Sequence, residues 1–207
     1  MRVTFRSAAL TIEGELAANA AATRGAVVCH PHPQYGGDMD NPVVLAVASA
    51  LSASGNSTLR FNFRGVGASD GSYANGIGEA EDLRAAVRFL CEHTGVRCVT
   101  VAGYSFGALV ALQATPTIAE ADRLIAVAPP LSFAGVEPVA AWTNEKLFIV
   151  GDRDQYCSVA QLVDALATVV EPKQHTIITG ADHFFAGYTG AVVDSVRSFS
   201  ANVAAVR

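Results

Sequence analysis

The sequence has 207 residues, of which 51% are hydrophobic and 16% are charged, and its formal net charge is -5. This composition excludes a disordered chain and predicts a single globular domain over residues 1–207. No run of Lys or Arg indicates binding to nucleic acid or a membrane surface, and no apolar run reaches the roughly 18 residues of a membrane span. Because the N-terminal segment also lacks the apolar core of a signal peptide, we expect a cytoplasmic protein that acts on a small molecule.

Strand-like and helix-like segments alternate along the chain. In chain order, we expect an opening hairpin (3–5 and 10–16), a strand (25–29), a helix (42–54), a strand (58–63), a helix (79–93), a strand (98–102) and a helix (106–114). Two strands (124–128 and 146–150), a helix (159–170), a strand (175–178) and a C-terminal helix (184–206, interrupted early by Gly187 and Gly190) follow. This alternation predicts an α/β fold with a mainly parallel central sheet and helices on both faces.

The pattern Gly-x-Ser-x-Gly occurs twice, centred on Ser69 and on Ser105. A nucleophilic serine in this pattern lies on a sharp turn between a buried strand and a helix, whose N-terminus faces the developing negative charge. Only Ser105 is preceded by a strand-like run and followed by a helix-like run. The sequence therefore predicts that Ser105 is the nucleophile, with a helix N-cap serine as the alternative, and that Ser69 lies in a solvent-exposed turn. We expect Gly103 and Gly107 to keep Cβ atoms out of the crowded turn.

A serine hydroxyl needs a neighbouring base, and an acid must orient that base. Only His175 and His183 follow the nucleophile in the sequence, and only His183 comes after a predicted strand, in a loop. Because active-site loops lie at the carboxyl ends of parallel strands, we predict His183 as the base. Asp152 and Asp154 compete as the acid after the strand at 146–150. We favour Asp154 because it lies farther into the loop.

Two backbone N–H groups are expected to hold the negatively charged oxygen of the reaction intermediate. One belongs to Phe106, which follows the nucleophile, and the other to the loop at residues 30–37. The two prolines of this loop have no N–H, so we predict His32 as the donor, with Gln34 or Tyr35 as alternatives. His30 and His32 have no third ligand at a recognisable spacing, so no metal site is predicted; instead we expect the His30 side chain to brace the loop. No nucleotide-binding motif is present, so no cofactor is expected.

Together, these residues resemble the α/β-hydrolase superfamily, in particular its small dienelactone-hydrolase-like and carboxylesterase-like branch without a lid. The resemblance covers most of the chain from about residue 25 onward. It rests on the ordered serine, acid and histidine loops, and on the segments His30-Pro-His-Pro33 with Gly36-Gly37 and Leu59-Arg-Phe-Asn-Phe-Arg-Gly65 with Gly67. Dienelactone hydrolases use a cysteine nucleophile, whereas this sequence has Ser105, and the usual His-Gly start of the oxyanion loop is His30-Pro31 here.

Only residues 129–145 separate the two strands between which related enzymes insert a lid, so we expect no lid domain and an open site. Tyr35, Tyr104 and Trp142 are candidates to line the substrate pocket, and so is Phe133; for Trp142 and Phe133 the alternative is packing in the core.

The predicted activity is hydrolysis of a small acyl ester, thioester or lactone through an acyl-enzyme intermediate. The alternatives are a binding protein on the same fold, and acyl transfer or carbon–carbon cleavage at the same site.

Overall fold

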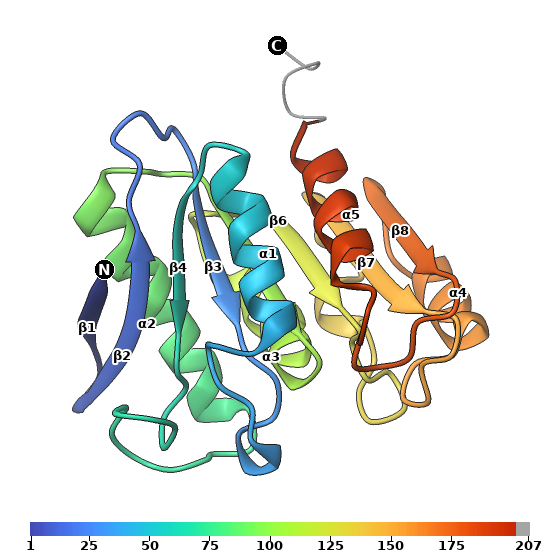
Figure 1. Ribbon diagram of the computed structural model, residues 1–207, viewed down its shortest axis with the longest axis horizontal. Helices are drawn as coiled ribbons and strands as arrows, with labels where there is room; N and C mark the ends of the chain where they lie inside the picture. Colours follow the sequence, from blue (N-terminus) through green and yellow to red (C-terminus); the bar gives the residue numbers. More distant parts are fainter. Residues whose placement is uncertain (202–207) are drawn as a thin grey trace.

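The computed structural model describes residues 1–201, and in this part of the chain eight strands form one central sheet (Figure 1). The strand order across the sheet is β1-β2-β4-β3-β5-β6-β7-β8. The strands are β1 (Arg2–Ser7), β2 (Leu10–Ala17), β3 (Gly25–Cys29), β4 (Ser57–Phe61), β5 (Val99–Tyr104), β6 (Ala121–Val127), β7 (Glu145–Gly151) and β8 (Lys173–Ile178).

The sheet is mainly parallel, as the sequence predicts. β1 and β2 form the predicted antiparallel hairpin at one edge, and β2 also runs antiparallel to β4. All other neighbouring strands are parallel, so β3 to β8 end along one common edge, the lower edge in Figure 1. Loops at this edge are therefore brought together from distant parts of the sequence.

Helices cover both faces of the sheet. α1 and α5 pack side by side on one face, against a core that includes Val44 and Phe199 (Figure 1). The other three helices bury their apolar residues in the core of the opposite face, which includes Leu83 and Leu162. The helices are α1 (Pro42–Ala53), α2 (Ile77–Thr94), α3 (Phe106–Ala114), α4 (Val159–Ala167) and α5 (Thr189–Ala201), with short 3₁₀ turns η1 (Pro33–Tyr35), η2 (Thr115–Thr117) and η3 (Glu137–Val139).

Several predicted boundaries differ from the structure, and three of the differences have a local reason. β4 ends at Phe61, because the Phe63 N–H donates to the His30 imidazole instead of to a neighbouring strand. α4 ends at Ala167, and the Val170 N–H bonds to the carbonyl of Ala140 rather than to its own helix.

The C-terminal helix begins at Thr189 instead of residue 184. Phe185 and Gly187 have φ angles of 53° and 80°, which no α-helix accommodates. Gly190 lies inside α5 and does not interrupt it. Residues 202–206 of the predicted helix lie outside the described residues.

The segment between β6 and β7 contains only the single turn η3 and no lid domain, as expected from its length. None of the helices within residues 1–201 is long and apolar enough to cross a membrane.

Candidate active site

Ser105 lies on the turn between β5 and α3, in a strained backbone conformation. Its φ is 55° and its ψ is -120°, a combination that few residues other than glycine adopt. A Cβ atom on Gly103 would lie 2.1 Å from the Gly107 oxygen, and one on Gly107 would lie 2.5 Å from the His30 oxygen. Both glycines are therefore required by close approach, which confirms the expectation for this turn.

The structure brings Ser105, His183 and Asp154 together from three loops at the same edge of the sheet. Ser105 Oγ lies 2.8 Å from His183 Nε2, and His183 Nδ1 lies 2.9 Å from Asp154 Oδ2. The Asp154 side chain is fully buried, and its Oδ1 accepts hydrogen bonds from the N–H groups of Tyr156 and Cys157. These bonds fix the carboxylate, and the carboxylate in turn fixes the orientation of the imidazole.

The competing residues have other partners. Asp152 accepts a hydrogen bond of 2.7 Å from the Gly180 N–H, which connects the loop after β7 to the loop that carries His183. His175 is exposed on the edge strand β8, where only β7 pairs with it. The prediction that Ser69 lies in a solvent-exposed turn is wrong. Its side chain is buried, accepting from the Glu13 N–H and donating to the Asn62 carbonyl, because the Gly-rich loop folds back onto β2.

Tyr104 supports the His183 loop from beneath and does not line a pocket, which corrects the sequence prediction. It is buried, and its hydroxyl donates a 3.0 Å hydrogen bond to the His183 carbonyl. Burial, with Asp154 and Asp182 nearby, raises the pKa of the Tyr104 hydroxyl, so it stays protonated and keeps this bond. The side chain points into the core because residues of a strand alternate between the two faces of the sheet.

His30 braces the loop after β3, as expected. Its Nε2 accepts from the Phe63 N–H at 2.9 Å, and its Nδ1 contacts the Pro31 carbonyl at 2.6 Å. This arrangement requires a neutral imidazole that carries its proton on Nδ1. Burial lowers the pKa of His30 to about 4, which keeps the ring in that form at neutral pH. Both ring nitrogens are occupied, so His30 offers no lone pair to a metal ion.

The N–H groups of Phe106 and His32, both near Ser105, have no hydrogen-bond acceptor within residues 1–201. The proposed alternatives are already engaged, because the Gln34 N–H donates to His32 Nδ1 and the Tyr35 N–H to the His32 carbonyl. The His32 and Phe106 rings lie 4.9 Å apart, so the loop and the start of α3 are adjacent. The N–H groups of His32 and Phe106 are therefore both available as donors beside Ser105.

Trp142 is far from this site, which corrects its prediction as a pocket residue. It lies just before β7 begins, at the opposite edge of the sheet, where its carbonyl accepts from Lys146 Nζ. The segment between β6 and β7 must return to that edge before a parallel strand can start. Phe133, at the beginning of the same segment, lies at the site edge and is 75% exposed.

Aromatic rings surround the Ser105–His183 pair on two sides. On one side, His32 has ring centroids 4.8 to 4.9 Å from Tyr35, Tyr73 and Phe106; we call this group the oxyanion-loop cluster. Tyr35 is 87% exposed, which places this predicted pocket residue at the rim.

On the other side, the His183 ring lies 4.7 Å from Tyr156 and 5.6 Å from Phe184, and Tyr156 lies 6.0 Å from Phe133. We call Tyr156, Phe184 and Phe133 the histidine-side cluster. Sequence reasoning missed Tyr73, Tyr156 and Phe184. Tyr156 and Phe184 each lie within two residues of a predicted site residue, a proximity that could have indicated them.

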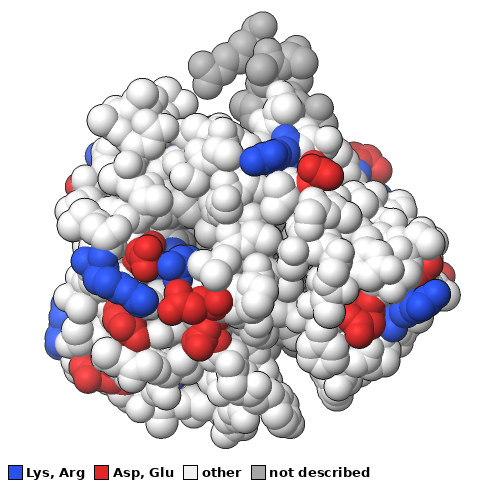
Figure 2. Space-filling model, viewed as in Figure 1, with Lys and Arg blue, Asp and Glu red and all other residues white. Residues whose placement is uncertain are grey.

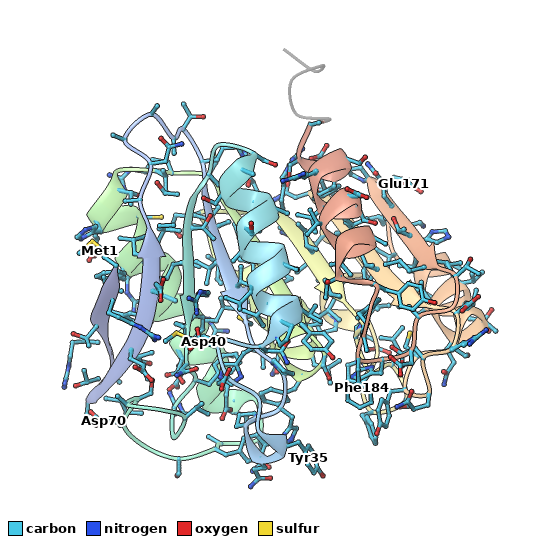
Figure 3. The ribbon with its side chains drawn as sticks, in the orientation of Figure 1. Met1, Tyr35, Asp40, Asp70, Glu171 and Phe184 are labelled. Carbon is cyan, nitrogen blue, oxygen red and sulfur yellow. The ribbon has the colours of Figure 1, made fainter. Side chains whose placement is uncertain are left out.

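An open cleft separates the two clusters. In Figure 3, Tyr35 of the first cluster lies at the lower margin of the molecule, and Phe184 of the second lies above it and to its right. In the same orientation, Figure 2 shows a notch in that margin, and the atoms along its walls on this face belong to uncharged residues.

Comparisons with known proteins agree on the relationship. The family model described as the alpha/beta hydrolase fold matches residues 27–167. An uncharacterized protein of Rickettsia prowazekii is 34% identical over 174 residues, which cover 77% of this chain and 71% of the relative. An α/β serine hydrolase homologue from Coxiella burnetii superposes with a TM-score of 0.88 at 32% identity, over 96% of both chains. A serine hydrolase without a lid from Xanthomonas campestris gives a TM-score of 0.84 at 31% identity, over 98% of this chain and 94% of that one.

Proposed function

The chain belongs to the α/β-hydrolase family, and from that premise we propose that it is a serine hydrolase that cleaves small acyl esters through an acyl-enzyme intermediate. The observation that carries the proposal is the continuous hydrogen-bond chain from Ser105 Oγ through the His183 imidazole to Asp154, with links of 2.8 and 2.9 Å. Distances of this size allow a proton to move from the serine to the histidine as the serine attacks.

In the first half of the reaction, His183 Nε2 takes the Ser105 proton while Oγ attacks the carbonyl carbon. Asp154 accepts a hydrogen bond from His183 Nδ1 and stabilises the imidazolium that forms. Its side chain is fully buried, so water does not weaken this interaction. The negative charge that develops on the carbonyl oxygen is received by the N–H groups of Phe106 and His32.

In the second half, protonated His183 gives its proton to the leaving oxygen, and the bond from the carbonyl carbon to that oxygen breaks. A water molecule then attacks the acyl-enzyme with His183 again as base, and Ser105 regains its proton. Thioesters and lactones pass through the same steps. The short connection between β6 and β7 leaves the site uncovered, which suits a small substrate better than a long lipid chain.

The first test is labelling of the purified protein with a fluorophosphonate, measured by intact mass, together with hydrolysis of 4-nitrophenyl acetate. We expect one adduct on the wild type and none on Ser105→Ala or His183→Ala. Ser69→Ala is the matched control, because it removes the serine of the other Gly-x-Ser-x-Gly pattern; it should be labelled if thermal unfolding shows a folded protein. A folded wild type that takes no adduct and hydrolyses no ester would refute the proposal and favour a binding role.

A further inference from the structure

The histidine-side cluster places three exposed large apolar side chains together beside the candidate active site. Phe133 is 75% exposed, Phe184 is 60% exposed and Tyr156 is 36% exposed. The rings of Tyr156 and Phe184 lie beside the His183 imidazole, and the Phe133 ring lies beside Tyr156. Single exposed apolar residues are common in soluble proteins, but a contiguous group at a cleft marks a surface that binds another apolar group.

The backbone holds two of these rings together. The Ser132 N–H donates to the Tyr156 carbonyl at 3.1 Å, which ties the segment after β6 to the Asp154 loop. This bond sets Phe133 beside Tyr156, although the two residues come from different connections of the sheet.

The third ring is held outward by local strain. Phe185 adopts a φ of 53° and is fully buried, so Phe184, its neighbour, faces solvent. The Asp182 carboxylate accepts a 3.0 Å hydrogen bond from the Phe184 N–H and fixes this turn. A positive φ at a phenylalanine is strained, and here the strained residue lies in the loop that presents His183 and Phe184 together.

The reaction chemistry assigns a role to this position. His183 Nε2 must reach the leaving oxygen to protonate it, so the leaving group extends past the His183 ring. The residues around that ring are Tyr156 and Phe184, with Phe133 behind Tyr156. All three are uncharged, and the visible cleft walls carry no charged side chain (Figure 2). An aromatic leaving group stacks on such rings, whereas a carboxylate would lose its hydration without gaining a cation.

We propose that the histidine-side cluster is a leaving-group subsite that takes an uncharged aromatic alcohol. This inference rests on the proposed ester hydrolysis. In the step concerned, the bond between the acyl carbon and the alcohol oxygen breaks, His183 donates its proton to that oxygen, and the aromatic alcohol departs along the cluster.

The test compares kcat/KM for benzyl acetate and ethyl acetate. Both esters release alcohols of similar acidity and form the same acetyl-enzyme, so their ratio reports only leaving-group recognition. After division by the ratio of their alkaline hydrolysis rates, we expect the wild type to prefer benzyl acetate by about tenfold or more. Benzyl acetate with a carboxylate at the para position should lose that preference.

Phe133→Ala and Phe184→Ala should each lower the benzyl-to-ethyl ratio by about threefold to tenfold. Phe133→Leu and Phe184→Leu keep apolar bulk without a ring and should also lower the benzyl-to-ethyl ratio. These variants replace the alanine variants in the test if the latter do not fold. Val170→Ala is the control: Val170 is 42% exposed and lies just before β8, at the opposite edge of the sheet. It should leave the ratio unchanged.

The outcomes separate the two proposals. A protein that takes the fluorophosphonate on Ser105 and hydrolyses both esters without preference, or whose ratio is unchanged in the Phe133 and Phe184 variants, overturns the subsite alone. A protein that takes no label and hydrolyses neither ester overturns the hydrolase proposal, and the subsite with it.

Discussion

Stability between pH 7 and pH 4 depends on His30, because its imidazole is buried in the neutral form. In the folded protein Nε2 accepts from the Phe63 N–H, so a proton added there would face another N–H. Burial lowers the pKa of His30 from 6.5 to about 4. In the unfolded chain the imidazole titrates near its ordinary value of about 6.5. Between these two pKa values the unfolded state therefore binds more protons than the folded state.

The sign of the effect follows from this difference. Below pH 6.5 protonation of His30 favours the unfolded chain, so the free energy of unfolding falls as the pH is lowered. Below about pH 4 the imidazole is protonated in both states, and His30 causes no further loss. The loss is about 2 kcal/mol at pH 5 and about 3 kcal/mol below pH 4. This loss is a large part of the stability of a typical domain, and it acts directly on the loop that carries the His32 N–H.

The assay is urea unfolding at pH 7 and pH 5 for the wild type, His30→Gln and His175→Gln. A glutamine at 30 can still accept from the Phe63 N–H but does not titrate. His30→Gln should be less stable at pH 7, yet it should lose about 2 kcal/mol less than the wild type between pH 7 and pH 5. His175→Gln, which changes an exposed imidazole on β8, should keep the wild-type pH dependence. Equal losses in the wild type and His30→Gln would refute the reasoning.

Substitutions at the site and in the core under α4 should have separate effects on activity and on stability. Tyr104→Phe leaves the His183 carbonyl buried without its donor; it should cost about 1–2 kcal/mol in urea unfolding and lower kcat, and an unchanged kcat would contradict the supporting role. Asp154→Asn should lower kcat by about 10⁴-fold, whereas Asp152→Asn should cost only about 1 kcal/mol of stability and keep most activity. A larger loss of ester hydrolysis in Asp152→Asn than in Asp154→Asn would identify Asp152 as the acid instead. Leu162→Ala should cost about 2–5 kcal/mol by opening a cavity under α4, while the folded fraction still takes one fluorophosphonate per chain.

The order of strands and helices, and the choice of Ser105 over Ser69, followed from the sequence alone. These features are local: apolar spacing separates helix from strand, and a buried strand followed at once by a helix distinguishes one Gly-x-Ser-x-Gly pattern from the other. The positions of His183 and Asp154 at strand ends were equally readable, because a parallel sheet places all such ends at one edge. The length of the segment between β6 and β7 was enough to exclude a lid.

The surroundings of the site were decided only by the tertiary structure. All six residues of β5 are buried, so no alternation along the strand indicates which face receives Tyr104. Trp142 and Phe133 belong to one segment, yet that segment crosses the whole sheet and leaves them at opposite edges. Phe184 and Phe185 are adjacent and chemically alike, and only a positive φ at Phe185 turns one to solvent and the other into the core. Such outcomes depend on how distant segments pack, and short-range patterns in a sequence carry no record of that packing.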